Sequence, residues 1–156
     1  MKLNKIALIV LVAIPVFVFL QSLPFKFSGA RETVYIFDTI GAWIQSLGFP
    51  SLGGFFAAHG AYGVGGAELI ASILLLVPKT RHWGALFGLA VLSGAIFFHV
   101  FTPLGIAVEF PGAKPGGDPL LFVMAVVSWV CLLALVVTHK NRFPFFGSNA
   151  VPTSGS

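Results

Sequence analysis

Four long apolar runs, separated by short polar segments, dominate the pattern of this chain. In order they are Ile6 to Leu20 with an extension toward Pro24, Phe55 to Val77, His82 to Phe101, and Leu120 to Val137. A helix needs about 20 apolar residues, at about 1.5 Å of rise each, to cross the hydrocarbon core of a bilayer. The pattern therefore predicts an all-α fold, an integral membrane four-helix bundle in which the second and third helices form a hairpin.

The segment between the first and second runs has a different pattern. It is too polar to span a membrane, yet it carries apolar side chains at helical spacing on one side: Ile36, Phe37, Ile40, Trp43, Ile44 and Leu47. Polar side chains occupy the other side, and Trp and Tyr are common at membrane interfaces. We expect an additional interfacial amphipathic helix here, serving either as a cap on the bundle or as a lid over a substrate.

Composition supports a membrane protein. Of the 156 residues, 57% are hydrophobic and 9% are charged, whereas about a quarter of the residues of a soluble domain are charged. We expect residues 1–142 to form a single transmembrane domain and residues 143–156 to form a flexible cytoplasmic tail. The single cysteine, Cys131, excludes an intramolecular disulfide and a CxxC redox pair.

The charges predict an orientation. The net charge is +4, but the basic residues gather at helix ends and form no stripe with interleaved aromatics, which argues against a nucleic-acid partner. One end of the bundle would collect Lys2, Lys5, Lys79, Arg81, Lys140 and Arg142, and the other Lys26, Arg31 and Lys114. Because Lys and Arg are retained on the cytoplasmic side, both termini are predicted to be cytoplasmic. Cleavage of the first run as a signal peptide, near Ser28-Gly29-Ala30, is the alternative to an uncleaved first helix.

Two ionisable residues inside the apolar runs are the leading candidates for function. Glu68 shares a helix face with Gly65 and Ser72, and His99 shares one with Gly84 and Gly88. Gly65, Gly84 and Gly88 are predicted to pack helices closely. Ionisable groups are costly in a bilayer unless they are paired, hydrated or turned inward, so Glu68 and His99 are expected to face the bundle interior.

Two stretches carry a resemblance to a known family: Lys26-Phe27-Ser28-Gly29 and VGGAELIASILLLVPKTRHWGALFGLAVLSGAIFFH. The second resembles the DoxX family of small four-helix bacterial membrane proteins. The resemblance covers the first three helices and implies a multipass protein of the bacterial cytoplasmic (inner) membrane. Some members of that family are associated with thiosulfate:quinone oxidoreductases or membrane-bound redox complexes. The family pattern points to Lys26, Glu68 and His99, without a defined mechanism for them.

The leading functional hypothesis is a membrane subunit of a redox system that binds a quinone or other apolar small molecule. Glu68 as proton relay and His99 as ligand contact would face one outward-opening polar pocket, with Lys26 at its rim. Helix rise places Glu68 about 10 Å deeper than His99, so a bridging group is expected between them.

Other hypotheses remain open. Glu68 and His99 could simply be satisfied polar contacts between helices. The chain could be a non-enzymatic anchor or assembly subunit whose small-residue faces bind a redox partner or a second copy, or a small proton-coupled carrier. Haem is disfavoured, because His59 lies about 180° round the helix from Glu68. The sequence shows no metal-binding cluster.

Overall fold

The computed structural model describes residues 4–139, and the regular secondary structure in that range consists of five helices. They are α1 (Lys5–Ser28), α2 (Arg31–Ser46), α3 (Pro50–Leu76), α4 (Arg81–Phe101) and α5 (Leu120–Thr138). All except α2 are long and apolar enough to cross a membrane. This confirms the prediction of an all-α fold with four helices able to span a membrane. The tail beyond residue 142, together with Lys2, Lys140 and Arg142, lies outside the described residues.

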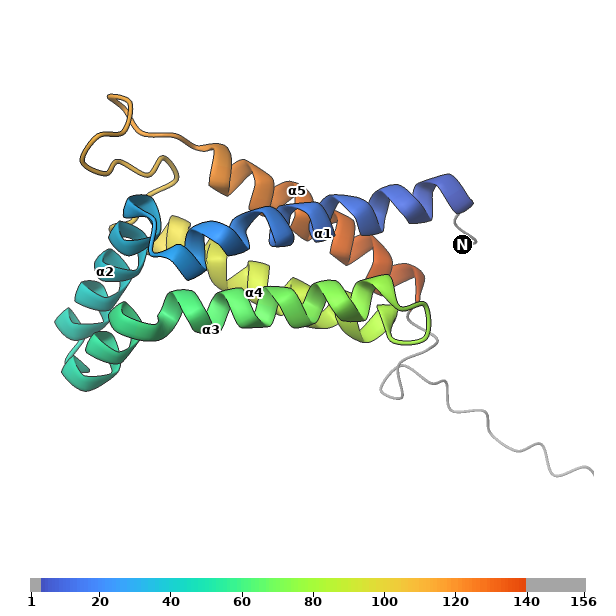
Figure 1. The fold of residues 1–156 in the computed structure, drawn as a ribbon, viewed down its shortest axis with the longest axis horizontal. Coiled ribbons are helices and arrows are strands. Elements are labelled where there is room, and N and C mark those ends of the chain that lie inside the picture. Colours follow the sequence, from blue (N-terminus) through green and yellow to red (C-terminus); the bar gives the residue numbers. More distant parts are fainter. Residues whose placement is uncertain (1–3, 140–156) are drawn as a thin grey trace, which may run out of the picture.

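The four long helices extend along the length of the molecule, with α5 inclined to α1 and α3, and α2 lies across them at one end (Figure 1). The start of α1 and the α3–α4 turn lie together at the opposite end, whereas the α4–α5 connection lies near α2. We call the end with the α3–α4 turn the closed end and the end with α2 the open end. The basic residues Lys79 and Arg81 are therefore separated from Lys26 and Arg31 by the length of the bundle, as the sequence predicts.

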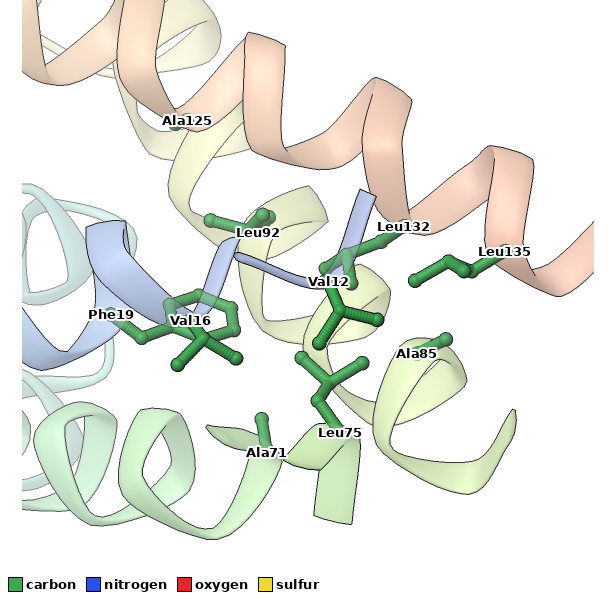
Figure 2. Packing of buried hydrophobic residues seen from close by; sticks show 10 residues of the cluster. All are labelled: Val12, Val16, Phe19, Ala71, Leu75, Ala85, Leu92, Ala125, Leu132 and Leu135. Atoms are coloured by element: carbon green, nitrogen blue, oxygen red, sulfur yellow. The ribbon is translucent and has the colours of Figure 1, made fainter. Parts of the chain in front are cut away.

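All four long helices contribute to one apolar core (Figure 2). Its members are Val12, Val16, Phe19, Ala71, Leu75, Ala85, Leu92, Ala125, Leu132 and Leu135. Large apolar side chains also cover the outer surface, among them Ile6, Phe17 and Ile73, which are 54–74% exposed. A water-soluble monomer rarely exposes such a continuous apolar surface, so this surface suits contact with lipid.

Helix α1 extends beyond its apolar run, through Pro24 and Lys26 to Ser28. It begins where the side chain of Asn4 accepts a hydrogen bond from the backbone N–H of Ala7, at 2.7 Å. It ends at Gly29, whose φ of 67° is in the left-handed region that glycine adopts readily. Lys26 therefore lies in the last helical turn of α1, a position that the apolar pattern alone did not predict.

Helices α2 and α3 form a tight hairpin, and both begin about five residues earlier than their apolar patterns suggest. Their backbones cross at Gly41 and Gly53: a Cβ on Gly41 would lie 2.7 Å from the carbonyl oxygen of Gly53. Only glycine permits so close an approach. The predicted amphipathic pattern of α2 turns Phe37 and Ile40 inward, where both are buried. The placement of α2 in a membrane interface remains a prediction.

The α4–α5 connection folds back onto α2. Its residues Val108 and Asp118 pair through two backbone hydrogen bonds of 3.3 and 3.4 Å. Leu104 and Val108 are buried and pack together with Ile40 of α2. This second, smaller apolar cluster joins α2 to the α4–α5 connection and covers the end of the bundle that we call open.

Candidate functional site

Of the three predicted site residues, Lys26 and His99 lie near the open end, whereas Glu68 lies deeper in the bundle, eight residues before the end of α3 at Leu76. Glu68 on α3 and His99 on α4 are each 7% exposed, so both side chains are inside the bundle, in agreement with the predicted inward orientation. They bind different partners, however. Glu68 accepts hydrogen bonds from α1, whereas His99 forms a hydrogen bond with the α4–α5 connection.

Glu68 forms a largely buried ion pair with Lys26, whose side chain is 16% exposed. The ammonium Nζ of Lys26 donates hydrogen bonds to Oε2 at 2.7 Å and Oε1 at 3.0 Å of the carboxylate. Ser22, one helical turn before Lys26 on α1, places its Oγ 2.8 Å from both Nζ and Oε2. Residues four apart share a helix face, so α1 presents Ser22 and Lys26 together to Glu68.

This Ser22–Lys26–Glu68 cluster leaves little hydrogen-bonding capacity for a ligand. Three oxygen atoms surround the ammonium group of Lys26, which has three hydrogens to donate. Opposite charges held in this way offset much of the cost of removing each from water. The cluster fastens α1 to α3, and any ligand contact with Glu68 would require the ion pair to open.

Small residues allow the helices of the bundle to approach closely. A Cβ on Gly65, one turn before Glu68, would lie 3.1 Å from Cζ of Phe27 on α1. At the closed end, a Cβ on Gly84 would lie 2.6 Å from the backbone nitrogen of Leu75 on α3. Gly88 faces Leu132 and Phe19 in the core. All three glycines thus lie at contacts within the chain, and the faces of Gly84 and Gly88 are not available to a partner helix.

His99 has a different environment from Glu68. Its Nδ1 lies 2.7 Å from the carbonyl oxygen of Gly105 in the α4–α5 connection. Its ring meets the ring of Phe122 on α5 edge to face, with the centroids 5.7 Å apart. Within the described part of the chain, one hydrogen bond and an aromatic contact thus hold the imidazole, so that the second ring nitrogen of His99 remains for binding.

A cavity of about 290 Å³ lies beside His99. Helices α3 and α4 form its walls through Gly63, Val64, Ala67, Ala90, Val91, Gly94, Ala95, Phe56 and Phe98, and α2 and the connection cover it through Ile36, Phe37, Ile40 and Leu104. His99 is the only residue among those lining it whose side chain contains nitrogen or oxygen. Small residues on both helices create the space.

A single polar pocket shared by Glu68, His99 and Lys26 is not what the structure shows. Lys26 lines a separate space of about 260 Å³ between α1, α2 and α5, and Glu68 lines neither space. The flexible stem of Lys26 lets its ammonium group reach the carboxylate of Glu68. The pairing is favourable because an unpaired charge inside the bundle would be costly. Two separate spaces and an ion pair therefore take the place of the predicted common pocket.

The second space also contains a carboxyl group with an altered acidity. Glu32, on α2 and outside the membrane-spanning helices, lines this space together with Gln21 and Thr33. Burial raises the pKa of Glu32 above its ordinary value, and the neighbouring carboxylate of Asp118 raises it further. Sequence reasoning missed Glu32, because its partner Asp118 is distant in the chain.

Other functional residues could be foreseen only in part. Ser22 is a polar residue one turn before Lys26 in an otherwise apolar run, and that spacing was an available signal. Gly105 gave no signal, because a backbone carbonyl partner does not depend on residue type. His59 is exposed and stacks on Phe55 with the ring centroids 4.9 Å apart, so it does not face the cavity beside His99. Among residues 4–139, no three His, Cys, Asp or Glu side chains gather to hold a metal ion.

Comparison of the chain with models of known protein families, with curated proteins and with solved structures finds no match. The fold and the site geometry therefore carry the functional argument.

Proposed function

We propose that this chain is a DoxX-like multipass protein of the bacterial inner membrane and the membrane subunit of a redox system. In this proposal it binds a quinone or a similar apolar small molecule beside His99. The observation that carries the proposal is the cavity between α2, α3 and α4, in which apolar walls surround one histidine. Ligand sites in proteins commonly combine a mostly apolar lining with a few placed polar groups.

The size of the cavity favours a small head group. Its volume of about 290 Å³ is at the lower end of the range of about 300–1,000 Å³ typical of ligand pockets. A single aromatic ring with small substituents fits such a space, whereas a haem or a nucleotide does not. The apolar lining and the histidine then suit a ring that carries one hydrogen-bonding group.

The position of the cavity favours entry from the lipid. Two residues that line it, Gly63 on α3 and Ala90 on α4, are exposed on the surface of the membrane-spanning helices. A Cβ on either Gly63 or Gly94 would meet no atom within 4 Å. An apolar tail attached to the head group could therefore leave between α3 and α4 and continue among the acyl chains.

The ion pair between Lys26 and Glu68 helps to position one wall of the cavity. Glu68 follows Ala67, which lines the cavity, so the contact of Glu68 with Lys26 holds this wall against α1. A proton relay through Glu68 belongs to the proposal only if Lys26 withdraws, because the carboxylate is otherwise paired.

Ligand content after purification tests the proposal. We expect the protein, extracted in a mild detergent, to retain a quinone-class molecule detectable by mass spectrometry. His99→Phe should lower that content by about tenfold, since it removes the one polar side chain in the cavity. His59→Phe, which changes an exposed histidine on α3, should keep it. Full retention of the molecule by His99→Phe, or its absence from the wild-type protein reconstituted with both a quinone and the corresponding quinol, would contradict the proposal.

The proposed orientation places both termini in the cytoplasm and α2 along the outer surface. Single cysteines at Thr80 and Gly116, introduced after Cys131→Ser, report the two ends of the bundle. A membrane-impermeant thiol reagent added outside the cell should label the cysteine at Gly116 and leave that at Thr80 unlabelled. The opposite pattern would reverse the orientation.

A further inference from the structure

The hydrogen bond between His99 and Gly105 determines which nitrogen of the imidazole carries hydrogen. Nδ1 of His99 lies 2.7 Å from the carbonyl oxygen of Gly105. A carbonyl oxygen can only accept a hydrogen bond, so Nδ1 must donate. A neutral imidazole has one N–H, which leaves Nε2 with a lone pair and no hydrogen. Nε2 is therefore a hydrogen-bond acceptor.

Local structure fixes the position of that carbonyl. Gly105 has a φ of 74°, a conformation that favours glycine, and it lies only six residues after His99. The hydroxyl of Thr102 binds the carbonyl of Phe98 in the last turn of α4 and accepts a hydrogen bond from the backbone N–H of Leu104 at 3.2 Å. The turn that carries the carbonyl is thus tied to the helix that carries the imidazole.

Nε2 of His99 is available for a ligand. Within the described part of the chain it makes no hydrogen bond, and it is not among the completely buried polar atoms that lack a partner. His99 lines the cavity between α2, α3 and α4, and the other residues that line it have apolar side chains. A molecule in the cavity that reaches Nε2 of His99 therefore meets a hydrogen-bond acceptor.

An acceptor in an apolar cavity discriminates between ligands. A hydroxyl group can donate to Nε2, whereas a ketone oxygen would place two lone pairs against each other and leave both groups unsatisfied. Sites built to pair with a ligand hydroxyl reject analogues that lack it, because buried polar groups are then left without partners. We infer that this cavity selects the hydroxyl-bearing, reduced form of its ligand, a quinol or an alkylphenol, over the oxidised quinone. The inference rests on the proposed function, that the cavity binds a molecule of this class.

Three probes with the same short alkyl tail test the inference: an alkyl hydroquinone, the corresponding benzoquinone and the hydroquinone dimethyl ether. Binding is measured to the full chain in nanodiscs, without oxygen and at neutral pH, with each affinity corrected for partition of the probe into empty nanodiscs. The hydroquinone should bind at least about tenfold more tightly than the quinone and the ether. Equal affinities, or tighter binding of the quinone, would overturn the inference and leave the proposed function standing. Failure of all three probes to bind would overturn the proposed function as well.

Substitutions link the preference to His99. His99→Gln offers both an N–H and a carbonyl at a similar reach, so the preference for the hydroquinone should fall to about threefold or less. His59→Gln is the matched control and should keep the wild-type preference. An unchanged preference for the hydroquinone in a folded His99→Gln protein would show that a group other than His99 discriminates between the probes, and would overturn the inference.

A spectroscopic measurement does not depend on a folded variant at position 99. The chain has four histidines, and ¹⁵N spectra distinguish a protonated from an unprotonated ring nitrogen. Assignment by substitution of His59, His82 and His139 leaves the His99 signals by elimination. We expect hydrogen on Nδ1 and none on Nε2 in the ligand-free protein. Hydrogen on Nε2, alone or together with hydrogen on Nδ1, would overturn the inference, because Nε2 would then be a donor.

Discussion

Helix α4 packs in opposite ways at the two ends of the bundle. At the closed end, a Cβ on Gly84 would lie 2.6 Å from the backbone nitrogen of Leu75, and side chains of four helices fill the interior. Ten residues along the same helix, a Cβ on Gly94 would meet nothing within 4 Å, and a cavity lies beside it. Glycine therefore brings two helices together at one end and leaves space between the same two helices at the other.

The difference extends to the ionisable groups. The buried His99 lies near the open end and the buried Glu68 lies deeper in the bundle, whereas the core at the closed end is formed by apolar side chains such as Leu75 and Leu135. An apolar core stabilises the fold but offers no hydrogen-bonding group to a ligand. Polar groups inside a membrane protein, in contrast, need partners. Glu68 has its partners within the chain, whereas the second ring nitrogen of His99 makes no hydrogen bond to residues 4–139.

The largest expected effect comes from breaking the ion pair. Lys26→Met leaves the Glu68 carboxylate buried with only Ser22 beside it, and loss of one partner of a buried pair typically costs about 3–5 kcal/mol. We expect a decrease of that order in the free energy of unfolding, measured by denaturant titration in detergent micelles.

The double variant Lys26→Met/Glu68→Leu is the control for this prediction. It removes both charges and should recover most of the lost stability, because no uncompensated charge remains. A double variant no more stable than Lys26→Met would show that packing of the lysine stem, and not charge pairing, holds α1 to α3.

The same substitution at two glycines of α4 sharpens the comparison of the two ends. Gly84→Leu forces atoms against the backbone of α3 and should lower the free energy of unfolding by about 1–3 kcal/mol, the usual cost of overpacking. Gly94→Leu meets no atom at its Cβ and gains helix propensity of up to about 1 kcal/mol. It should therefore keep the fold, while its side chain occupies the cavity and lowers the content of bound ligand.

Gly66→Leu is the matched control for Gly94→Leu. Its Cβ would also meet nothing within 4 Å, but Gly66 does not line the cavity. Thermal unfolding and ligand content are compared for the three variants. Equal stability of Gly84→Leu and Gly94→Leu, or equal ligand loss in Gly66→Leu and Gly94→Leu, would remove the distinction between the two ends.

The smallest expected effect concerns Glu32, whose pKa is raised by burial and by Asp118. A raised pKa means that the folded protein holds this proton to a higher pH than the unfolded chain, so stability falls as the pH rises above the ordinary value of 4.5. Glu32→Gln should therefore give a small increase in melting temperature at about pH 7 and none at about pH 4. Asp38→Asn, which removes an exposed carboxylate from the same helix, is the control. A decrease on substitution of Glu32 at neutral pH would contradict the proposed sign.

The sequence predicted the four spanning helices well, because length and continuous apolarity are sufficient physical conditions for them. It also placed Glu68 and His99 inside the bundle, since an ionisable group facing lipid is costly. It did not predict that Lys26 would extend α1 and pair with Glu68. The ends of helices depend on such tertiary contacts, and Lys26 lies 42 residues from its partner.

The cavity could not be predicted for a related reason. Its walls are residues such as Gly63, Ala67 and Gly94, whose types are equally consistent with close helix packing. Whether a small residue closes or opens a gap depends on the distance between the helix axes at that depth. The glycine pattern alone therefore predicted packing at Gly84 correctly and gave no sign of the space at Gly94.

The close crossing of α2 and α3 at Gly41 and Gly53 bears on how a ligand would reach the cavity. Backbones in direct contact hold α2 over the cavity as a fixed roof, so exchange through the top requires that contact to separate. The side between α3 and α4 is then the easier route, and it faces the bilayer. Occupancy of the site would follow the mole fraction of ligand dissolved in the membrane and not its aqueous concentration. Two ligands of equal intrinsic affinity would then compete according to their lipid solubility.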